Sequence, residues 1–211
     1  MARTGGSRGW LGRILCWLLA ACVLANLAAA GAAWYRYGLL RALPPEHPPY
    51  GDDALLNADM WLGNLMGWRR AMIAASGLLL IGWLDSMRNL ADVVWPAGQR
   101  RSRLWLLGGW AIPIGNLFLI KMFVNDLWAA GRADHRRGNV LLTVWWLSGL
   151  AAFGSSWARL GGVPEAGHAR QAWEQMRELI LSDALFVVTA ALTIAVVRRL
   201  GGVLERAAAE P

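Results

Sequence analysis

The sequence predicts an all-α integral membrane protein with four transmembrane helices and one broken or re-entrant helical hairpin. Of its 211 residues, 56% are hydrophobic and only 17% are charged, whereas soluble domains carry about 25% charged residues. Apolar runs recur along the chain, and most of them approach the ~20 residues that cross a bilayer. Arginines gather in the short segments between the runs. The apolar runs are residues 14–35, 71–84, 104–120, 140–158 and 179–197.

The first 13 residues form a short basic segment that we expect in the cytoplasm, before a single membrane domain over residues 14–200. The run at 14–35 is predicted to be a retained first helix, with alanines every fourth residue from Ala21 to Ala33 for close helix packing. One alternative stays open, because Leu19-Ala20-Ala21-Cys22 matches the pattern that is cleaved in bacterial lipoproteins. Against it, the residues after Cys22 stay hydrophobic.

Residues 38–60 are predicted to form the first loop, because two Pro-Pro pairs interrupt helix there. The second helix is expected to begin between Leu55 and Ala71 and to end near Leu90. Arg69 and Arg70 lie above its apolar core, and we expect both to extend to the outer headgroups. Deeper placement of these arginines would be a functional signal, since charge inside a membrane is costly.

Residues 104–130 are apolar enough to enter a membrane, yet Pro113, Gly115 and Asn116 interrupt the run. Proline removes a helix hydrogen bond, and a backbone group freed in this way must find a partner inside the protein. The segment also carries Lys121, Asn125 and Asp126, with Asp126 predicted to pair with Lys121 or Arg88. The candidate polar cluster at the helix break therefore comprises Pro113, Gly115, Asn116, Lys121, Asn125, Asp126, Arg88 and Asn89.

The distribution of arginines favours the hairpin over a fifth span, because Lys and Arg in short loops stay on the cytoplasmic side. If residues 104–130 enter and leave on one face, 13 arginines lie inside and 7 outside, with both termini cytoplasmic. If the segment crosses once, 10 lie on each side and the bias vanishes. A five-span arrangement and an amphipathic helix lying at the inner interface remain the alternatives.

The last two helices are predicted at 140–158 and 179–197. Ser148, Ala152 and Ser156 give the first of them another stripe of small residues. Arg198 and Arg199 follow the second, and residues 201–211 are expected to be a flexible tail because they are poor in apolar residues.

Several short motifs carry a resemblance to a known family. They are Trp83 with Arg88-Asn89, Gly109-Trp110, Pro113-Ile114-Gly115-Asn116-Leu117, Asp126-Leu127-Trp128 and Trp145-Trp146. With these motifs the chain resembles, over roughly residues 60–197, a family of bacterial multi-pass membrane proteins known as domain of unknown function 4328. It departs from the family pattern at Ile120-Lys121-Met122 and at Asp85-Ser86. The resemblance implies the bacterial cytoplasmic membrane as location and assigns no activity.

The residue types argue against catalysis, so we expect no enzyme, no cofactor and no metal. The three histidines, His47, His135 and His168, all fall in predicted loops, and no pair of them has the spacing of a metal site. The net charge of +7 is spread over short loops, so nucleic acid is not an expected partner. The expected partners are the bilayer, anionic headgroups at the basic loops, and a second copy or another membrane protein. A non-enzymatic scaffold or accessory subunit is the favoured function, and a small oligomeric transporter or channel is the alternative.

Overall fold

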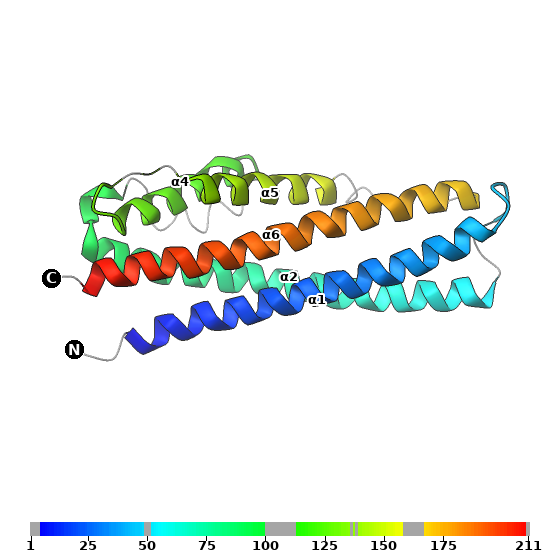
Figure 1. Cartoon of the computed structure of the whole chain (residues 1–211), viewed down its shortest axis with the longest axis horizontal. Coiled ribbons are helices and arrows are strands. Elements are labelled where there is room, and N and C mark those ends of the chain that lie inside the picture. The colour runs from blue at the N-terminus through cyan, green and yellow to red at the C-terminus, as the bar shows by residue number, and fades with distance from the viewer. Residues whose placement is uncertain are drawn as a thin grey trace. The chain divides into compact units, whose positions relative to one another are not determined.

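The computed structural model is helical throughout the parts of the chain that it describes, which are residues 5–48, 52–99, 113–135, 137, 139–157 and 167–209. No strand occurs in these ranges. Figure 1 labels the helices in chain order. They are α1 (Gly5–Ala42), α2 (Asp53–Val94), the short 3₁₀ helix η1 (Pro96–Gly98), α4 (Pro113–Ala130), α5 (Val140–Trp157) and α6 (Ala169–Ala209).

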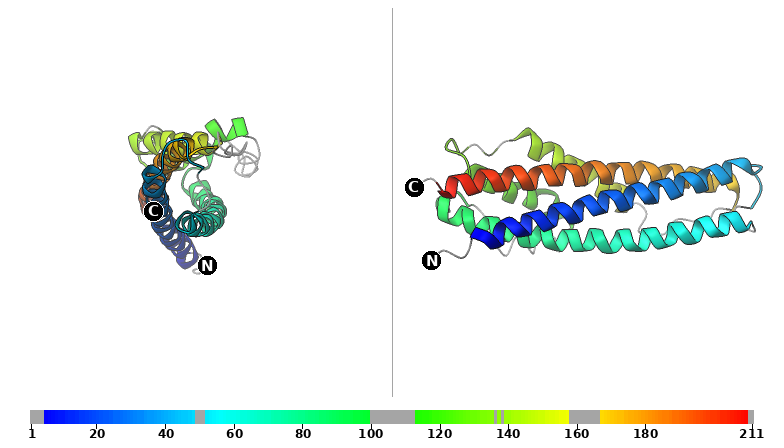
Figure 2. Two further views of the ribbon diagram at one scale, coloured as in Figure 1. Left: turned by 90° about the vertical axis from the view of Figure 1, so that its right-hand side faces the viewer. Right: turned by 60° about the horizontal axis from the view of Figure 1, so that its bottom comes forward.

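Three of these helices, α1, α2 and α6, are long and apolar enough to cross a membrane. They contain 38, 42 and 41 residues, which at about 1.5 Å per residue exceeds the ~30 Å hydrocarbon thickness of a bilayer. Figure 2 shows α6 as one unbroken helix, coloured orange to red. In the most apolar window of each helix only 22–28% of the residues are buried, so most of these side chains face outward.

The first loop is shorter than the sequence predicts. α1 continues through Gly38 to Ala42, and α2 already begins at Asp53. α1 therefore ends only close to Pro44, which has no backbone N–H group to donate to a helix hydrogen bond. α2 begins early because the Asp52 carboxylate accepts a hydrogen bond from the Ala54 amide at 2.9 Å, which satisfies one of the free N–H groups of the first turn.

The C-terminal residues also differ from prediction, because α6 continues through the expected tail to Ala209. Leu200 and Leu204 are fully buried. Residues 201–211 are poor in apolar side chains on average, but Leu204 lies four residues after Leu200 and so extends the same buried face by one turn. Packing on that face stabilises the helix where composition alone predicts none.

Residues 113–130, where the sequence predicts an interruption, form one continuous helix, α4. The helix includes Gly115 and Asn116, so the predicted interruption at these two residues is wrong. Residues 104–112, and with them the entry path of the predicted hairpin, lie outside the described residues.

The remaining predicted span, 140–158, corresponds to α5, which has 18 residues. The Asn139 carboxamide oxygen caps its first turn by accepting a hydrogen bond from the Leu141 amide at 2.7 Å. α5 is apolar but shorter than the three long helices.

The chain divides into two compact units. The first unit comprises residues 1–19, 74–147 and 191–211, and the second comprises residues 20–73 and 148–190. In the first, the indole of Trp83 is buried against small residues: a Cβ added to Gly12 would lie 3.2 Å from its Nε1, and one added to Gly201 would lie 3.8 Å from its Cζ2.

The core of the second unit joins α1, α2 and α6. One group of buried side chains there comprises Ala33, Leu62 and Leu179, and a second comprises Leu40, Leu55 and Ala172. Ala29 and Ala33 of the predicted alanine stripe are fully buried, and Ala152 of the stripe on α5 is 2% exposed. The other described members of the two stripes, Ala21, Ala25 and Ser148, are half-buried.

Candidate functional site

Each unit contains a cluster of buried polar side chains, and the cluster in the first unit includes two of the residues that the sequence indicated, Arg88 and Asp126. Asp126, near the end of α4, is 1% exposed. Its carboxylate accepts a hydrogen bond from Nε of Arg137 at 3.1 Å. Arg137 follows α4 in the connection to α5, and its Nη2 also donates to the carbonyl oxygen of Gly98 at 3.4 Å. One arginine thereby ties α4 to η1.

Arg88 is a second buried arginine of this cluster, with a side chain that is 8% exposed. Its Nε donates to the carboxylate of Asp92 at 2.9 Å, and its Nη1 donates to the side-chain oxygen of Gln99 at 2.8 Å. The guanidinium also lies 5.7 Å from the centre of the Phe123 ring on α4. Arg88 therefore connects the end of α2 with η1 and α4.

Stacked rings close the same end of the first unit. The rings of Trp95 and His135 lie 4.0 Å apart and within 8° of parallel. His135 has a left-handed φ of 48°, and its Nδ1 lies 3.1 Å from the Ala129 carbonyl oxygen. Next to it, Nε of Arg132 donates a hydrogen bond to the Asp134 carboxylate. This hydrogen bond raises the pKa of the Arg132 guanidinium. The guanidinium of Arg137 lies 5.6 Å from the Trp95 ring on its way to Asp126.

The predicted partners within this cluster are wrong in detail. Asp126 pairs with Arg137, while Lys121 lies with its ammonium 4.5 Å from the centre of the Trp146 ring. Lys121 and Asp126 are five residues apart, which places their side chains about 140° apart around the helix axis. They therefore point in different directions. Asn89 and Asn125 are half-buried. The side chains of Pro113, Gly115 and Asn116 lie outside the described residues.

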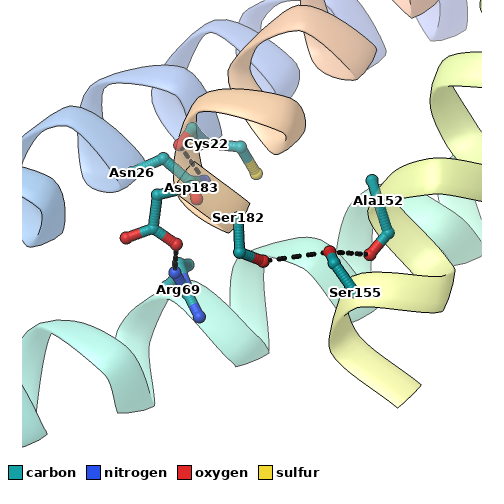
Figure 3. Close-up of polar contacts among 7 residues, drawn as sticks. All are labelled: Cys22, Asn26, Arg69, Ala152, Ser155, Ser182 and Asp183. Atoms are coloured by element: carbon teal, nitrogen blue, oxygen red, sulfur yellow. Dashed lines mark hydrogen bonds and ion pairs between the residues drawn. The ribbon is translucent and has the colours of Figure 1, made fainter. Parts of the chain in front are cut away.

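The second cluster was not predicted. Arg69 of α2 forms an ion pair with Asp183 of α6 (Figure 3). The Asp183 side chain is 1% exposed and that of Arg69 is 12% exposed. The prediction that Arg69 extends to the outer headgroups is therefore wrong, whereas Arg70, the next residue along, is exposed. Such a pair would be a functional signal inside a membrane, because charge is costly there.

Other helices add polar groups to the second cluster, as Figure 3 shows. Asn26 of α1 is 3% exposed and donates from Nδ2 to the Cys22 carbonyl oxygen at 2.8 Å. Ser155 of α5 donates to the Ala152 carbonyl oxygen at 2.9 Å and lies 3.1 Å from the Ser182 hydroxyl. Among the described residues, Oδ1 of Asn26 and Nε of Arg69 are buried without a hydrogen-bond partner.

A signal for the second cluster was present in the sequence. The run 179–197 is apolar on average, but it contains Asp183. An aspartate in such a run is costly to bury unless a cation or several hydrogen-bond donors compensate it. Arg69 is in turn followed by the charge-free run 71–84. Pairing the acid of one apolar helix with the base of another would have placed both residues in the interior.

The chemistry of both clusters is that of mutual neutralisation. Each buried carboxylate binds an arginine, and no histidine or cysteine side chain joins Asp126 or Asp183 in the hydrogen bonds and ion pairs described above. Within the described residues, no three His, Cys, Asp or Glu side chains come together to hold a metal ion. Breaking such a pair by removing one partner typically costs about 3–5 kcal/mol, because the other charge stays buried.

The described residues define an all-helical protein with three helices long and apolar enough to cross a membrane. Its buried aspartates, Asp126 and Asp183, each pair with an arginine. The chain belongs to the family described as Domain of unknown function (DUF4328), whose model matches residues 48–202. The resemblance noted from the motifs is thereby confirmed. The matched range contains both ion pairs and leaves the whole of α1 outside. No curated protein and no solved structure matches the chain.

Proposed function

We propose that this protein is a multi-pass protein of the bacterial cytoplasmic membrane that acts as a non-enzymatic scaffold or accessory subunit. One observation carries the proposal: the buried polar side chains bind one another between helices. Arg137 binds Asp126, Arg69 binds Asp183, and the Trp145 indole donates to the Thr193 hydroxyl at 2.9 Å. Such contacts specify how helices pack and leave little chemistry available for a substrate.

Exposed aromatic and aliphatic side chains support the membrane location. The indoles of Trp17 and Trp68 are 77% and 73% exposed, and Leu24 and Leu78 are 68% and 72% exposed. Soluble proteins rarely leave extended apolar surfaces in water. We propose four spans, formed by α1, α2, α5 and α6. In this topology α4 enters the membrane with residues 104–112 and does not cross it, and both termini are cytoplasmic.

Three surface hollows lie away from the buried charges. Their volumes are about 580, 290 and 490 Å³, and none of these three is lined by Arg69, Asp183 or Asp126. The exposed faces of α1 and α2 that carry Trp17 and Trp68 are available to a partner helix.

Photo-crosslinking in native membranes tests the scaffold directly. A photoreactive amino acid in place of Trp17 or Trp68 should give discrete cross-links to another protein or to a second copy of the chain. The same replacement at Trp83, which is 2% exposed, is the matched control and should give none. If the exposed positions yield only lipid adducts, the scaffold proposal is wrong.

A transporter or channel is the second candidate, favoured by the buried Arg69–Asp183 pair. Purified protein in liposomes distinguishes the two functions, with the double variant Arg69→Gln/Asp183→Asn as comparison. A scaffold should show no proton or potassium flux above empty liposomes in either form. Flux through the natural protein that disappears in the double variant would establish the transporter.

A further inference from the structure

A basic surface pocket of about 290 Å³ lies within the second unit, where the end of α1 meets the beginning of α6. It belongs to neither buried cluster. Its charged lining consists of three arginines and one acid, and two aromatic rings complete it. The lining includes Tyr37, Arg41, Arg170, Trp173, Glu174 and Arg177.

Aromatic rings position one of the three arginines. The guanidinium of Arg41 lies 4.5 Å from the centre of the Trp173 ring and 6.0 Å from that of Tyr37. Such stacking holds the planar guanidinium by its face. Its N–H groups at the edge then stay available for an oxyanion, since Arg41 has no ion-pair partner among the described residues.

The pocket has more positive than negative charge. Glu174 pairs with Arg170, with Nε and Oε1 3.5 Å apart on successive turns of α6. Arg177 follows Glu174 by three residues and therefore lies on the same side of the helix. Arg177 forms no ion pair within the described parts of the chain. Three guanidinium groups and one carboxylate line the pocket, which leaves a net charge of about +2 for an anion to neutralise.

Backbone hydrogen bonds fix the two sides of the pocket to each other. The amide of Ala169 donates to the His47 carbonyl oxygen at 2.9 Å, and the amide of Arg170 donates to the Pro45 carbonyl oxygen at 3.3 Å. The same bonds occupy amides at the beginning of α6. An anion here would consequently be held by guanidinium groups and not by the helix terminus.

We propose that this pocket binds a phosphate group, carried by an anionic phospholipid headgroup or free in solution. Arginine suits tetrahedral oxyanions because its planar N–H groups can donate two parallel hydrogen bonds to two oxygens. Three guanidinium groups around one hollow can therefore contact a phosphate from several sides. The apolar faces of Tyr37 and Trp173 also suit the glycerol backbone that a lipid phosphate would bring.

Binding to the purified full chain in a nonionic detergent tests the proposal. The probes are phosphatidylglycerol, phosphatidylcholine and inorganic phosphate, measured by native mass spectrometry and by thermal stabilisation. The test variant is Arg41→Gln/Arg170→Gln/Arg177→Gln, whose three positions are exposed. The matched control, Arg70→Gln/Arg198→Gln/Arg199→Gln, removes equal charge from exposed positions elsewhere.

The natural protein and the control variant should bind phosphatidylglycerol more tightly than phosphatidylcholine. The test variant should lose about 100-fold in affinity, at about fivefold per arginine. Inorganic phosphate that competes with the lipid identifies the phosphate alone as the ligand, whereas absence of competition identifies the lipid headgroup. Equal affinity of the test and control variants for phosphatidylglycerol would overturn the proposal. Failure of the natural protein to bind either phosphatidylglycerol or inorganic phosphate would also overturn it.

Discussion

Asp183 and Arg69 show how one pair of residues can determine the packing of two helices. Both lie in helices that are otherwise apolar there, and each compensates the charge of the other. A buried pair of this kind adds little net stability compared with an apolar pair of equal size, but it strongly penalises any arrangement that separates the charges. Its contribution is therefore specificity of packing between α2 and α6 in the second unit.

Removing one member of this pair should be far more harmful than removing both. Asp183→Ala should lower the free energy of unfolding by about 3–5 kcal/mol, because Arg69 would stay buried without its counter-ion. The double variant Arg69→Met/Asp183→Leu should recover most of that loss. Unfolding of the purified protein in mixed micelles measures both.

The Arg36–Asp59 pair between α1 and α2 provides the control, since the Asp59 side chain is 46% exposed. Asp59→Ala should cost about 1 kcal/mol or less. Equal losses from Asp183→Ala and Asp59→Ala would show that burial of the first pair has no energetic effect.

Arg88 should be sensitive even to a substitution that conserves its charge. Its two hydrogen bonds leave from different nitrogen atoms, Nε to Asp92 and Nη1 to Gln99. The single ammonium group of lysine cannot reproduce this fork. Arg88→Lys should therefore cost about 1.5–3 kcal/mol, the usual contribution of a hydrogen bond to a charged group. In the same unfolding assay, Arg70→Lys at an exposed position should leave the free energy of unfolding unchanged. If Arg88→Lys also leaves it unchanged, the assigned geometry is contradicted.

Single residues also show how much of the site the sequence predicts. Arg88 and Asp126 are recognisable because each is charged and lies close to apolar sequence, and both are buried in the structure. The partner of Asp126 could not be derived, because Arg137 comes from a connecting segment whose path follows no periodicity. Asp183 could have been identified from its position in an apolar run, since it needs a compensating charge there.

At the scale of elements, hydrophobic runs locate helices well and locate their ends poorly. The apolar runs at 14–35, 71–84 and 179–197 fall within helices, and all but the last residue of the run at 140–158 forms α5. The ends depend on caps and buried faces instead. α2 begins at the Asp52 cap, and α6 continues past Arg199 because Leu200 and Leu204 are buried. α4 is continuous through Gly115 and Asn116, where an interruption was predicted.

Contact between the end of α4 and α6 should depend on the small size of Gly131. A Cβ at this position would lie 2.6 Å from Cγ1 of Val203 and 3.1 Å from the backbone nitrogen of Leu204. The backbone of α6 cannot move aside without breaking its own hydrogen bonds, so Gly131→Ala should cost about 1–3 kcal/mol.

Gly202, one residue before Val203, is the matched control because a Cβ added there meets nothing within 4 Å. Gly202→Ala should raise stability by about 0.5–1 kcal/mol, since alanine loses less conformational entropy in a helix. Thermal unfolding of both variants measures the opposite signs. Stabilisation by Gly131→Ala would show that α4 and α6 do not approach this closely.

At the scale of the whole molecule, the number of spans in the proposed membrane topology depends on whether α4 crosses. The sequence identifies helices that could cross a membrane, and α1, α2 and α6 are long enough to do so. Whether α4 crosses depends on residues 104–112 and on the surrounding bilayer, which hydropathy does not specify. The arginine distribution is independent of both, and it favours a topology in which α4 does not cross.

Cysteine labelling at two exposed positions tests this topology in intact cells. Asp134 precedes α5 and Gly167 precedes α6, so in a four-span protein they lie on opposite sides of the membrane. Position 134 should then be cytoplasmic and protected from a membrane-impermeant maleimide, whereas position 167 should be labelled from outside. Cys16→Ala/Cys22→Ala provides a background without the native thiols. If α4 crosses the membrane, the pattern inverts: position 134 is labelled from outside, position 167 is protected, and the C-terminus lies outside, against the arginine bias.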